Sequence, residues 1–472
     1  MFTVLLVGSF LPPLDFFIVN VALPSIQADL GSSAAAEQMV ISSYAALYAV
    51  TLITGGRLGD LYGRGRMFFL GLIGFAAASL LCGLAWSPWA LIAGRMLQGV
   101  TAAVMAPQAL ASVQAIFPES EKPLALSLYG AVFGLAAVLG QALGGILISL
   151  DLFGLGWRMV FLVNLPVALL VIVFGMRLMK KLSEQGTGKL DPAGMLLSML
   201  TLALLIVPLT EGREAGWPWW SWLSLAAAPL VAWAFWRHES RLARSGGAPL
   251  LDPAALRAPG LARALLIALC FYSVGAFFLL FSVYLQHALH VSALDAGLVF
   301  LPFGMGYLLG PLATPCCRRI AGDWVNPIGM GLETVGFLAL AWLVDTTATG
   351  VASASAPLAV MLFVIGLGQG LALPTLMRMI TGRVAPAFAG MIAGIASSTL
   401  QLSTALSVAL IGGIFYTNLG GSDEPAAITH AFVVAALCIA SCLAVGAALG
   451  VTLARGQVAY LRMRANDSGP IK

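Results

Sequence analysis

The stretch Leu11-Pro12-Pro13-Leu14-Asp15-Phe16-Phe17-Ile18-Val19-Asn20-Val21-Ala22-Leu23-Pro24 lies in the first long apolar segment of the chain. Asp15 is the only charged side chain between Met1 and Ala28. Inserting a carboxylate at the centre of a membrane helix costs about 2.5–3.5 kcal/mol, so such a residue is a functional hypothesis by default. Two interpretations are open: Asp15 binds and releases a proton, or it forms a static ion pair with a basic residue on a neighbouring helix.

The composition of the whole chain indicates a membrane protein. Of the 472 residues, 60% are hydrophobic and 9% are charged, with a mean hydropathy of +0.96, whereas about 25% of a soluble domain is charged. Apolar segments of about 20 residues, the length of a membrane-spanning helix, recur from end to end. The alternating pattern of an outer-membrane barrel is absent. We therefore expect an all-α polytopic membrane protein.

The apolar segments predict fourteen membrane-spanning helices, at residues 4–28, 36–56, 67–86, 89–116, 122–149, 158–179, 191–210, 219–236, 263–286, 293–315, 327–345, 355–377, 388–416 and 430–453. The connections after the even-numbered spans, together with the C-terminal tail, contain 21 of the 24 Lys and Arg residues. By the positive-inside rule, both termini are expected in the cytoplasm. Nothing before Leu5 resembles the basic region of a signal peptide, so we expect the first segment to be retained.

Two polar linkers rich in helix breakers, at residues 181–190 and 238–262, separate the seventh and eighth spans from two blocks of six. We predict an N-terminal six-helix bundle (1–180), two additional transmembrane helices (181–240), a cytoplasmic linker (241–262), a C-terminal six-helix bundle (263–455) and a cytoplasmic tail (456–472). A weak repeat joins the fifth spans of the two blocks, since residues 140–145 and 409–413 both end in a glycine pair. Two related halves with a site between them at mid-membrane is the plan of a transporter.

The segment after the second span reads Gly56-Arg57-Leu58-Gly59-Asp60-Leu61-Tyr62-Gly63-Arg64-Gly65-Arg66. Its glycines remove side chains where helices must approach closely. Asp60 can reach a neighbouring helix N-terminus or an arginine, and Arg64 follows one turn later. The alternative is an ordinary positively charged loop, which would not require this glycine spacing.

This segment resembles the cytoplasmic loop signature of the major facilitator superfamily, G-x-L-x-D-x-x-G-R-[RK]-x, with the usual basic pair split by Gly65. In that family the loop latches the two halves on the cytoplasmic side. The resemblance therefore implies a conformational latch formed by Gly56, Gly59, Asp60, Gly63, Arg64 and Arg66.

In the fourth span, Arg95-Met96-Leu97-Gln98-Gly99 places Arg95, Gln98 and Gly99 on one helix face. A buried arginine needs an acid or several carbonyl groups, and Asp15 is the expected partner. The segment is similar to the family's fourth-helix R-x-x-Q-G motif, in which the arginine is implicated in proton transfer.

Three further segments agree with this resemblance. Gly140-Gln141-Ala142-Leu143-Gly144-Gly145 is similar to the antiporter-type G-P-x-x-G-G, but Gln141 replaces the proline, which weakens the implied kink and leaves the close-packing glycines Gly140, Gly144 and Gly145. Residues 157–166 resemble W-R-x-x-F-x-x-N-x-P. The opening stretch resembles the L-D-x-x-I-V-N-V-A-L-P signature of the fourteen-helix drug:proton antiporter branch. The resemblance covers essentially the whole chain, with its specific motifs at residues 11–166.

A second intramembrane acid, Glu333, lies about six residues into its span, roughly 9 Å deep. It could bind a cationic substrate or a second proton, or it could reach the cytoplasmic interface or pair with Arg318 or Arg319. The proton-coupling candidates are therefore Asp15, Arg95 and Glu333. Uncharged candidates for the wall of a substrate cavity are Tyr44, Tyr48, Gln98, Phe133, Gln141, Tyr272, Phe278 and Gln369. The aromatic residues among them suit flat lipophilic cations through stacking and cation–π contact.

Groups that bind metals are sparse in this sequence. The six cysteines fall mostly within apolar segments without zinc-type pairs, and His287, His290 and His430 have no neighbouring ligand at metal spacing. We read the cysteines as core residues and the histidines as interfacial residues. The tryptophans at 217, 219, 220 and 222 are interpreted as an interfacial anchor. We expect no metal and no cofactor.

The resemblance implies a secondary transporter, not an enzyme: a proton-coupled multidrug efflux antiporter that exports lipophilic, cationic compounds across the bacterial cytoplasmic membrane by alternating access. Its partners would be small-molecule drugs or dyes, protons and the lipid bilayer. No nucleic acid is expected, the chain is expected to be a monomer, and a periplasmic accessory protein is left open. Alternatives are a transporter of an amphiphile, a lipid or another small molecule, with Arg95 meeting an anionic head group, an intramembrane enzyme, and a non-transporting sensor. The enzyme would need clustered His, Asp or Glu residues inside the bilayer, where only Asp15, Arg95 and Glu333 are expected.

Overall fold

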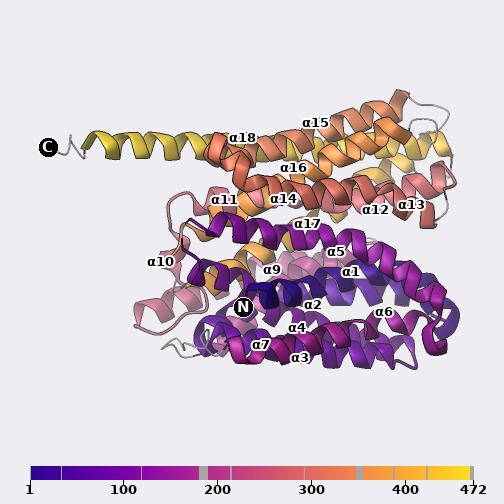
Figure 1. The fold of residues 1–472 in the computed structure, drawn as a ribbon, viewed down its shortest axis with the longest axis horizontal. Coiled ribbons are helices and arrows are strands. Elements are labelled where there is room, and N and C mark those ends of the chain that lie inside the picture. Colours follow the sequence, from indigo (N-terminus) through magenta and orange to yellow (C-terminus); the bar gives the residue numbers. More distant parts are fainter. Residues whose placement is uncertain are drawn as a thin grey trace.

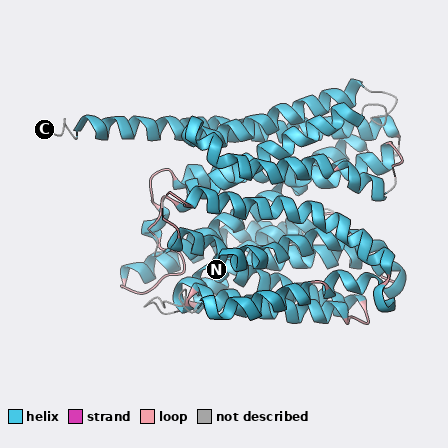
Figure 2. Ribbon diagram, viewed as in Figure 1, coloured by secondary structure: helices cyan, strands magenta, loops and turns pink. Residues whose placement is uncertain are grey.

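The computed structural model describes residues 2–32, 34–118, 120–179, 190–212, 215–291, 293–346, 355–385, 388–420, 422 and 424–467. Within these residues every regular element is helical (Figure 2). The first half contains α1 (Phe2–Leu30), α2 (Ala34–Tyr62), α3 (Arg64–Gly83), α4 (Pro88–Ile116), α5 (Lys122–Leu150), α6 (Met159–Leu162) and α7 (Asn164–Met179). The middle contains α8 (Pro192–Glu211), α9 (Trp219–Arg244) and the short α10 (Pro253–Leu256).

The second half contains α11 (Leu261–Phe271), α12 (Gly275–Val283), α13 (Ala293–Val299), α14 (Leu301–Ala321), α15 (Val325–Thr346), α16 (Ser355–Thr381), α17 (Ala389–Leu419) and α18 (Pro425–Asp467). Short 3-10 turns, η1 (Leu152–Gly154), η2 (Gly156–Arg158), η4 (Tyr272–Val274) and η6 (Gly322–Trp324), and one π-helical turn, η5 (Tyr284–Ala288), connect the longer helices.

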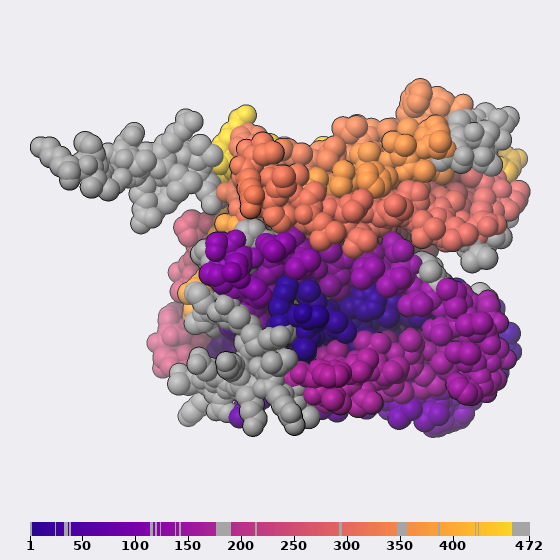
Figure 3. All heavy atoms as spheres, in the orientation of Figure 1, coloured from indigo at the N-terminus to yellow at the C-terminus, as the bar shows by residue number. Residues whose placement is uncertain are grey.

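The helices form two bundles that lie side by side (Figure 1). Helices α1–α7 form the lower bundle in that view, and α11–α18 form the upper one. The bundles meet where α5 packs against α14 and α2 packs against α17, and the space-filling view shows α5 and α14 in contact (Figure 3). Helix α8 packs against α9 and also against α2 and α17, so the middle pair sits beside this interface.

Twelve helical stretches of the described residues are long and apolar enough to cross a membrane, so the predicted count of fourteen is not confirmed. One of the twelve, Asp295–Thr346, has 52 residues and includes both α14 and α15, which η6 separates. Helix α9 is outside the twelve, because its tryptophan, serine and arginine residues lower its hydropathy.

Several predicted spans are interrupted or longer than expected. The span at 263–286 is divided by η4, which begins at Tyr272, and the span at 158–179 is divided where α6 ends and Asn164 begins α7. The predicted boundary at 455/456 is not a break, because α18 continues to Asp467 and projects beyond the bundle (Figure 1). Residues 181–189 of the first predicted linker lie outside the described residues.

Candidate functional site

Asp15 is fully buried in α1, where groups from two other helices donate hydrogen bonds to its carboxylate. Arg95 Nη1, from α4, forms an ion pair with Asp15 Oδ2. Gln98 Nε2 and Asn164 Nδ2 donate to Oδ1 at 3.1 and 2.9 Å. The expected pair of Asp15 and Arg95 is therefore formed. Three donors thus surround one carboxylate, and a buried ion pair is tolerated only with such additional hydrogen bonds.

Arg95 is held by further groups of the first bundle. Its Nε donates to Val40 O at 2.9 Å, and its Nη1 donates to Gln98 Oε1 at 2.8 Å. The guanidinium carbon lies 4.2 Å from the ring centroid of Tyr44, whose hydroxyl donates to Pro12 O at 3.1 Å. The Asp15–Arg95 pair thus links α1, α2 and α4. Its Nη2 atom has no hydrogen-bond partner among the described residues, so the guanidinium is engaged through Nε and Nη1.

Glu333 is also fully buried, on α15, but neither of its carboxyl oxygens has a hydrogen-bond partner among the described residues. Pairing with Arg318 is not found, because Arg318 lies 3.7 Å from Asp323 instead, and Arg319 is exposed. The fully buried side chain does not reach the interface either, so neither structural alternative for Glu333 is seen. An ionised carboxylate without partners would carry a large desolvation cost at this position.

Glu333 packs against α16 at a glycine. A Cβ added at Gly368 would lie 2.8 Å from Glu333 Cγ and 2.5 Å from the carbonyl oxygen of Gly329, so the two helices approach closely there. Tyr272 and Tyr307 are the electrostatic neighbours of Glu333. The side chain of Glu333 thus lies against the backbone of α16, with these two tyrosines nearby.

Four tyrosines, which we call the tyrosine cluster, neighbour one another between the two bundles: Tyr48 of α2, Tyr129 of α5, Tyr272 of η4 and Tyr307 of α14. Tyr48 stacks on Tyr44 with ring centroids 5.9 Å apart, which connects the cluster to the Asp15 site. The neighbouring backbones of α5 and α14 are close, since a Cβ added at Gly134 would lie 2.8 Å from the carbonyl carbon of Tyr307. The cluster therefore lies between the two buried acids.

The segment predicted to form the latch joins the two bundles in this structure. Asp60, near the end of α2, accepts hydrogen bonds from the backbone N–H groups of Gly390 and Met391, at 3.0 and 2.8 Å, in the first turn of α17. Arg64 pairs with Asp60 at 3.2 Å and donates to Ala111 O at 3.2 Å. The carboxylate thus caps a helix N-terminus of the other bundle, where free N–H groups and the helix dipole favour an anion.

The glycines of this segment fit the same contact. A Cβ on Gly56 would lie 2.2 Å from Gly390 O, and a Cβ on Gly59 would lie 1.8 Å from Gln108 Oε1. Gly63 has a φ of +93°, a backbone conformation that favours glycine. Arg66 is exposed on α3 and adds no hydrogen bond to the latch within the described residues.

Two of the three predicted packing glycines contact α1. A Cβ on Gly140 would lie 2.6 Å from Phe17 Cβ, and one on Gly144 would lie 3.1 Å from Ile18 O. A Cβ on Gly145 would meet nothing within 4 Å among the described residues, so no helix contact is seen there in this structure. The close approach of α5 to α1, the helix that carries Asp15, depends on the other two.

The remaining cavity candidates are dispersed. Gln98 belongs to the Asp15 network, Gln369 is buried with Oε1 unpartnered among the described residues, and Phe133 packs on Tyr129. Phe278 packs among other phenylalanine rings, and the side chain of Gln141 lies outside the described residues. Two hollows, of about 670 Å³ between α9 and α10 and about 340 Å³ between η5, α13 and α16, are not lined by any predicted cavity residue.

One titratable cluster was missed from the sequence: Asp191, His238 and Glu239. Asp191 accepts from Gly194 N at 2.9 Å and lies 2.9 Å from His238 Nε2, while Glu239 Oε2 accepts from Leu251 N at 2.8 Å. One ligand atom from each of the three lies within 4.8 Å of the others, which is close enough for a metal ion. The carboxylates already have structural roles, because Asp191 caps α8 and Glu239 fixes the segment before α10. Burial raises the pKa of Glu239 to about 7.

Sequence reasoning also missed two partners of the central site. Asn164 stood in the W-R-x-x-F-x-x-N-x-P segment but was not assigned to Asp15, and Ser79, whose hydroxyl accepts from Gln98 Nε2 at 2.8 Å, carried no signal. The first two residues of the same segment hold the C-terminal end of α1. Trp157 Nε1 and Arg158 Nη1 donate hydrogen bonds to Asp29 Oδ2 at 3.0 and 2.7 Å. His287, His290 and His430 are all exposed.

Two helical bundles, with buried polar groups inside each half and a capped helix joining them at one end, are the arrangement of a membrane transporter. The profile of the Major Facilitator Superfamily matches residues 5–408. The chain belongs to this superfamily, and it is a multi-pass membrane transporter and not an enzyme.

Similar proteins and a solved structure agree with this assignment to the superfamily. The chain is 37% identical to the probable actinorhodin transporter of Streptomyces coelicolor, over 86% of this chain and 70% of that protein. It is 35% identical to the puromycin resistance protein pur8 of Streptomyces alboniger, over 87% of this chain and 80% of that protein. The crystal structure of the human organic anion transporter MFSD10 has the same fold, with a TM-score of 0.69 and 16% identity over 95% of this chain and 98% of that one.

Proposed function

We propose that the protein is a proton-coupled exporter of lipophilic, cationic antibiotics and related compounds across the bacterial cytoplasmic membrane. The observation that carries this proposal is the pair of buried acids on either side of the tyrosine cluster. Asp15 is balanced by Arg95 in one half, and Glu333 stands without a partner in the other. The names of the relatives, an antibiotic transporter and an antibiotic resistance protein, support the choice of substrate class.

Proton uptake by Asp15 would change the balance between conformations. Its carboxylate now receives donors from α4 and α7, and a neutral carboxyl group cannot maintain the ion pair with Arg95. The contact that holds α1 to α4 would weaken, which changes the relative free energies of the two transporter states. Asp15 would release the proton on the cytoplasmic side and regain its charge.

Glu333 would act as the second protonation site or as the group that attracts the cation. Without a hydrogen-bond partner in this conformation, it is expected to be neutral here. A cationic substrate close to Tyr272 and Tyr307 would favour the ionised form by direct attraction and would gain cation–π contact with the rings. Proton and cation would then exclude each other at the same carboxylate.

The available energy is sufficient for export. A proton moving inward releases about 2.3 kcal/mol per 100 mV of membrane potential and about 1.36 kcal/mol per pH unit. When one proton exchanges for one monovalent cation, the two charge movements cancel, so a pH difference of one unit supports a concentration ratio of about tenfold. A second proton per cation would add the contribution of the membrane potential.

The latch would control access from the cytoplasm. Asp60 caps α17 in this structure, so the conformation is closed at the arginine-rich end of the bundles. Opening that end would require these two backbone hydrogen bonds to break. The contact between Asp60 and α17 would therefore form in the part of the transport cycle in which the substrate site faces outward.

We propose fourteen membrane crossings with both termini in the cytoplasm. The 52-residue stretch Asp295–Thr346 would be about 78 Å long as one helix, more than twice the thickness of a bilayer core, so it supports two crossings. Helix α9 has 26 residues and exposes Trp219 and Trp222 near one end and Trp233 and Trp236 near the other, which suits a helix with aromatic residues at both interfaces. We expect the chain to act as a monomer.

Transport by the purified protein in proteoliposomes tests this proposal. Ethidium, a cationic dye, and puromycin should be moved against their gradients when a pH gradient is imposed, and the movement should stop when an ionophore removes the gradient. Equal transport with and without the gradient would contradict proton coupling. Selective transport of anionic lipid analogues would favour the amphiphile alternative, in which Arg95 meets an anionic head group.

A further inference from the structure

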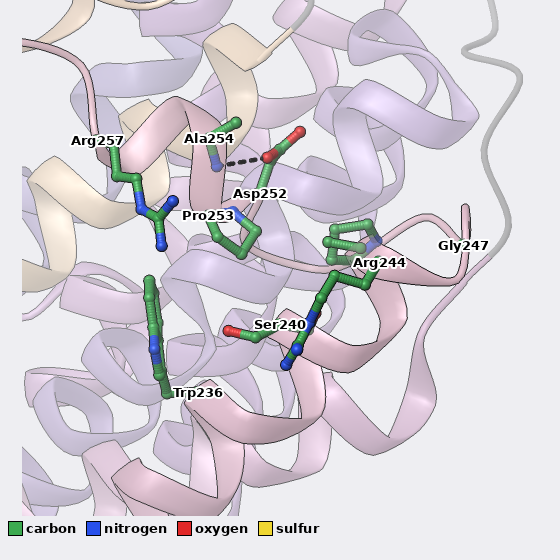
Figure 4. Close-up of a pocket in the computed structure, with 10 residues that line it drawn as sticks. Trp236, Ser240, Arg244, Gly247, Asp252, Pro253, Ala254 and Arg257 are labelled. Atoms are coloured by element: carbon green, nitrogen blue, oxygen red, sulfur yellow. Dashed lines mark hydrogen bonds between the residues drawn. The ribbon is translucent and has the colours of Figure 1, made fainter.

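We propose that the hollow between α9 and α10 is a binding site for the phosphate group of an anionic phospholipid. Its volume is about 670 Å³, and its wall includes Trp236, Ser240 and Arg244 of α9 and Arg257 just after α10 (Figure 4). It lies apart from the two buried acids and the tyrosine cluster. Its occupancy is therefore independent of the transport mechanism proposed above.

The position of this hollow corresponds to the edge of the membrane. The exposed large side chains of α9 run from Trp219 to Trp236, which are 17 residues and about 26 Å apart along a helix, close to the thickness of a bilayer core. Arginines at positions 237, 241 and 244 follow at once. The change from exposed tryptophan to exposed arginine is typical of the level of lipid head groups.

The side chains that face the hollow match a phosphodiester. Trp236, Ser240 and Arg244 are spaced four residues apart and share one face of α9. Arg244 uses Nε to donate to Ser240 O at 3.0 Å, which leaves the donors of its two Nη atoms for another acceptor. Arg257 faces Trp236 from the other side of the hollow (Figure 4). Two guanidinium groups with one hydroxyl supply charged, directional donors for phosphate oxygens.

The positive charge in the hollow is not neutralised within the described residues. No carboxylate of the described residues lies within 4.0 Å of Arg244 or Arg257. Asp252 also lines the hollow, but its Oδ1 accepts from Ala254 N at 2.8 Å, which holds this oxygen at the start of α10. The hollow is therefore lined by two arginines and one carboxylate, and it has room for an added anion.

A lipid is favoured over a soluble phosphate compound because of the surface next to the hollow. Trp233 and Leu230, one and two turns before Arg237, are 59% and 69% exposed. This surface would contact the acyl chains while the phosphate group occupies the hollow. Basic pockets at the cytoplasmic side of membrane helices bind anionic head groups in the same way.

Native mass spectrometry of the full-length protein in detergent, titrated with phosphatidylglycerol, tests the proposal. The variant Arg244→Gln/Arg257→Gln should bind phosphatidylglycerol about 25-fold more weakly, which corresponds to about fivefold per arginine. The variant Arg241→Gln is the matched control, because Arg241 is exposed on the same helix and does not line the hollow. It should bind like the unmodified protein. Circular dichroism and gel filtration would show that all variants are folded.

Further titrations separate a lipid from a free anion. Phosphatidylcholine should bind far more weakly than phosphatidylglycerol, and inorganic phosphate at millimolar concentration should displace little of the bound lipid. Equal binding of the two lipids, or an equal loss in the Arg241→Gln control, would overturn the proposal. Full displacement of the lipid by inorganic phosphate would overturn the lipid assignment and indicate a site for soluble phosphate compounds.

Discussion

The two buried acids, Asp15 and Glu333, have different surroundings, so the cost of burying each carboxylate is offset in a different way. Asp15 has an arginine, a glutamine and an asparagine around its carboxylate, so its charge is balanced. Glu333 has none of these donors among the described residues, and a proton is the simplest way to remove its charge. A transporter that couples a proton to a cation needs one group that can change its charge within the membrane. The contrast makes Glu333 as strong a candidate for this role as Asp15.

Removing Arg95 should expose the dependence of Asp15 on its partner. Arg95→Gln leaves an unpaired carboxylate in a fully buried site, and breaking a buried pair in this way costs about 3–5 kcal/mol. Thermal unfolding in detergent should show a clear loss of stability. The double variant Asp15→Asn/Arg95→Gln has no unpaired charge and should be more stable than Arg95→Gln alone. An unfolding temperature for Arg95→Gln equal to that of the unmodified protein would disprove the energetic importance of the pair.

Glu239 should make the stability of the protein depend on pH. Its pKa in the folded protein is about 7, against 4.5 for an ordinary glutamate, chiefly because of burial. The folded state therefore holds a proton that the unfolded state has lost between these values. The resulting stabilisation is complete below about pH 4.5 and is lost as the pH rises to 7.

A thermal unfolding series from pH 4.5 to pH 8 checks this dependence. The unfolding temperature should decrease as the pH rises from 4.5 to about 7, and above that pH Glu239 should contribute no further change. The total effect of Glu239 on the free energy of unfolding should be at most about 3 kcal/mol. Glu239→Gln cannot titrate and should flatten this part of the curve. If the curves of the two proteins have the same slope, Glu239 does not have the raised pKa.

At the scale of single residues, the sequence was informative where one charge stood in an apolar segment. Asp15 and Arg95 were recognised, and their pairing followed from the cost of burying each alone. The tyrosine cluster was only half recognised: Tyr48 and Tyr272 were candidates, but Tyr129 and Tyr307 were not. Tyrosines on four helices have no spacing in the sequence that relates them, and only the packing of α5 against α14 brings them together.

At the scale of helices, contacts between backbones decide how the two bundles close. Gly56 on α2 faces Gly390 on α17, and a Cβ on either would collide with the other helix or with Asp60. Gly55 similarly faces the carbonyl oxygen of Ala103 on α4, which a Cβ would approach to 2.1 Å. The end of α2 is thus fitted between α4 and α17. Small residues allow this because no side chain separates the helices.

Gly56→Ala should shift the protein away from the closed conformation. Its Cβ would lie 2.2 Å from Gly390 O, and overpacking of this kind costs about 1–3 kcal/mol, which is about 5- to 150-fold in the population of the closed state. Spin labels at the exposed positions Glu121 and Ile320, one in each bundle, would report the separation of the two bundles. We expect a larger population at long distance in Gly56→Ala.

The variant Gly145→Ala is the matched control for this measurement. Gly145 belongs to a helix of the same bundle, and a Cβ there meets nothing within 4 Å. Its distance distribution should be that of the unmodified protein. A Gly56→Ala distribution that also remains unchanged would show that the α2–α17 contact does not control closure.

Helix boundaries were less predictable than the existence of the helices. Hydropathy located each apolar segment but gave no sign that η4 divides the segment at Tyr272 or that α7 begins at Asn164. The break at η4 places Tyr272 in the tyrosine cluster, and the break before α7 places Asn164 beside Asp15. Local composition does not indicate either break. Conversely, α9 was predicted as a span, but its tryptophans and arginines keep it outside the twelve apolar stretches.

At the scale of the whole molecule, the two-bundle arrangement was predicted from the glycine-rich loop and from the repeated six-helix pattern. The superfamily match over residues 5–408 confirms the fold. The relation between the bundles could not be predicted, because Asp60 contacts a helix N-terminus 330 residues away in the chain. A single carboxylate thereby connects the state of one bundle to the position of the other.

Asp60→Asn should favour opening at the arginine-rich end. The amide retains one acceptor oxygen but loses the charge that the helix dipole and Arg64 stabilise, so the latch should weaken by about 1–2 kcal/mol. Labelling of a cysteine introduced at Ser398, which is 3% exposed and lies on α17 facing α2, should become faster by about tenfold. An unchanged labelling rate would contradict the latch.

The central claim is that buried acids couple proton movement to export, and transport in proteoliposomes under an imposed pH gradient tests it most directly. Ethidium transport by the unmodified protein and by Asp345→Asn, which changes an exposed acid on α15, should respond to the gradient. Folded Asp15→Asn and Glu333→Gln proteins should each lose that response. A response of wild-type size in both variants would contradict the account.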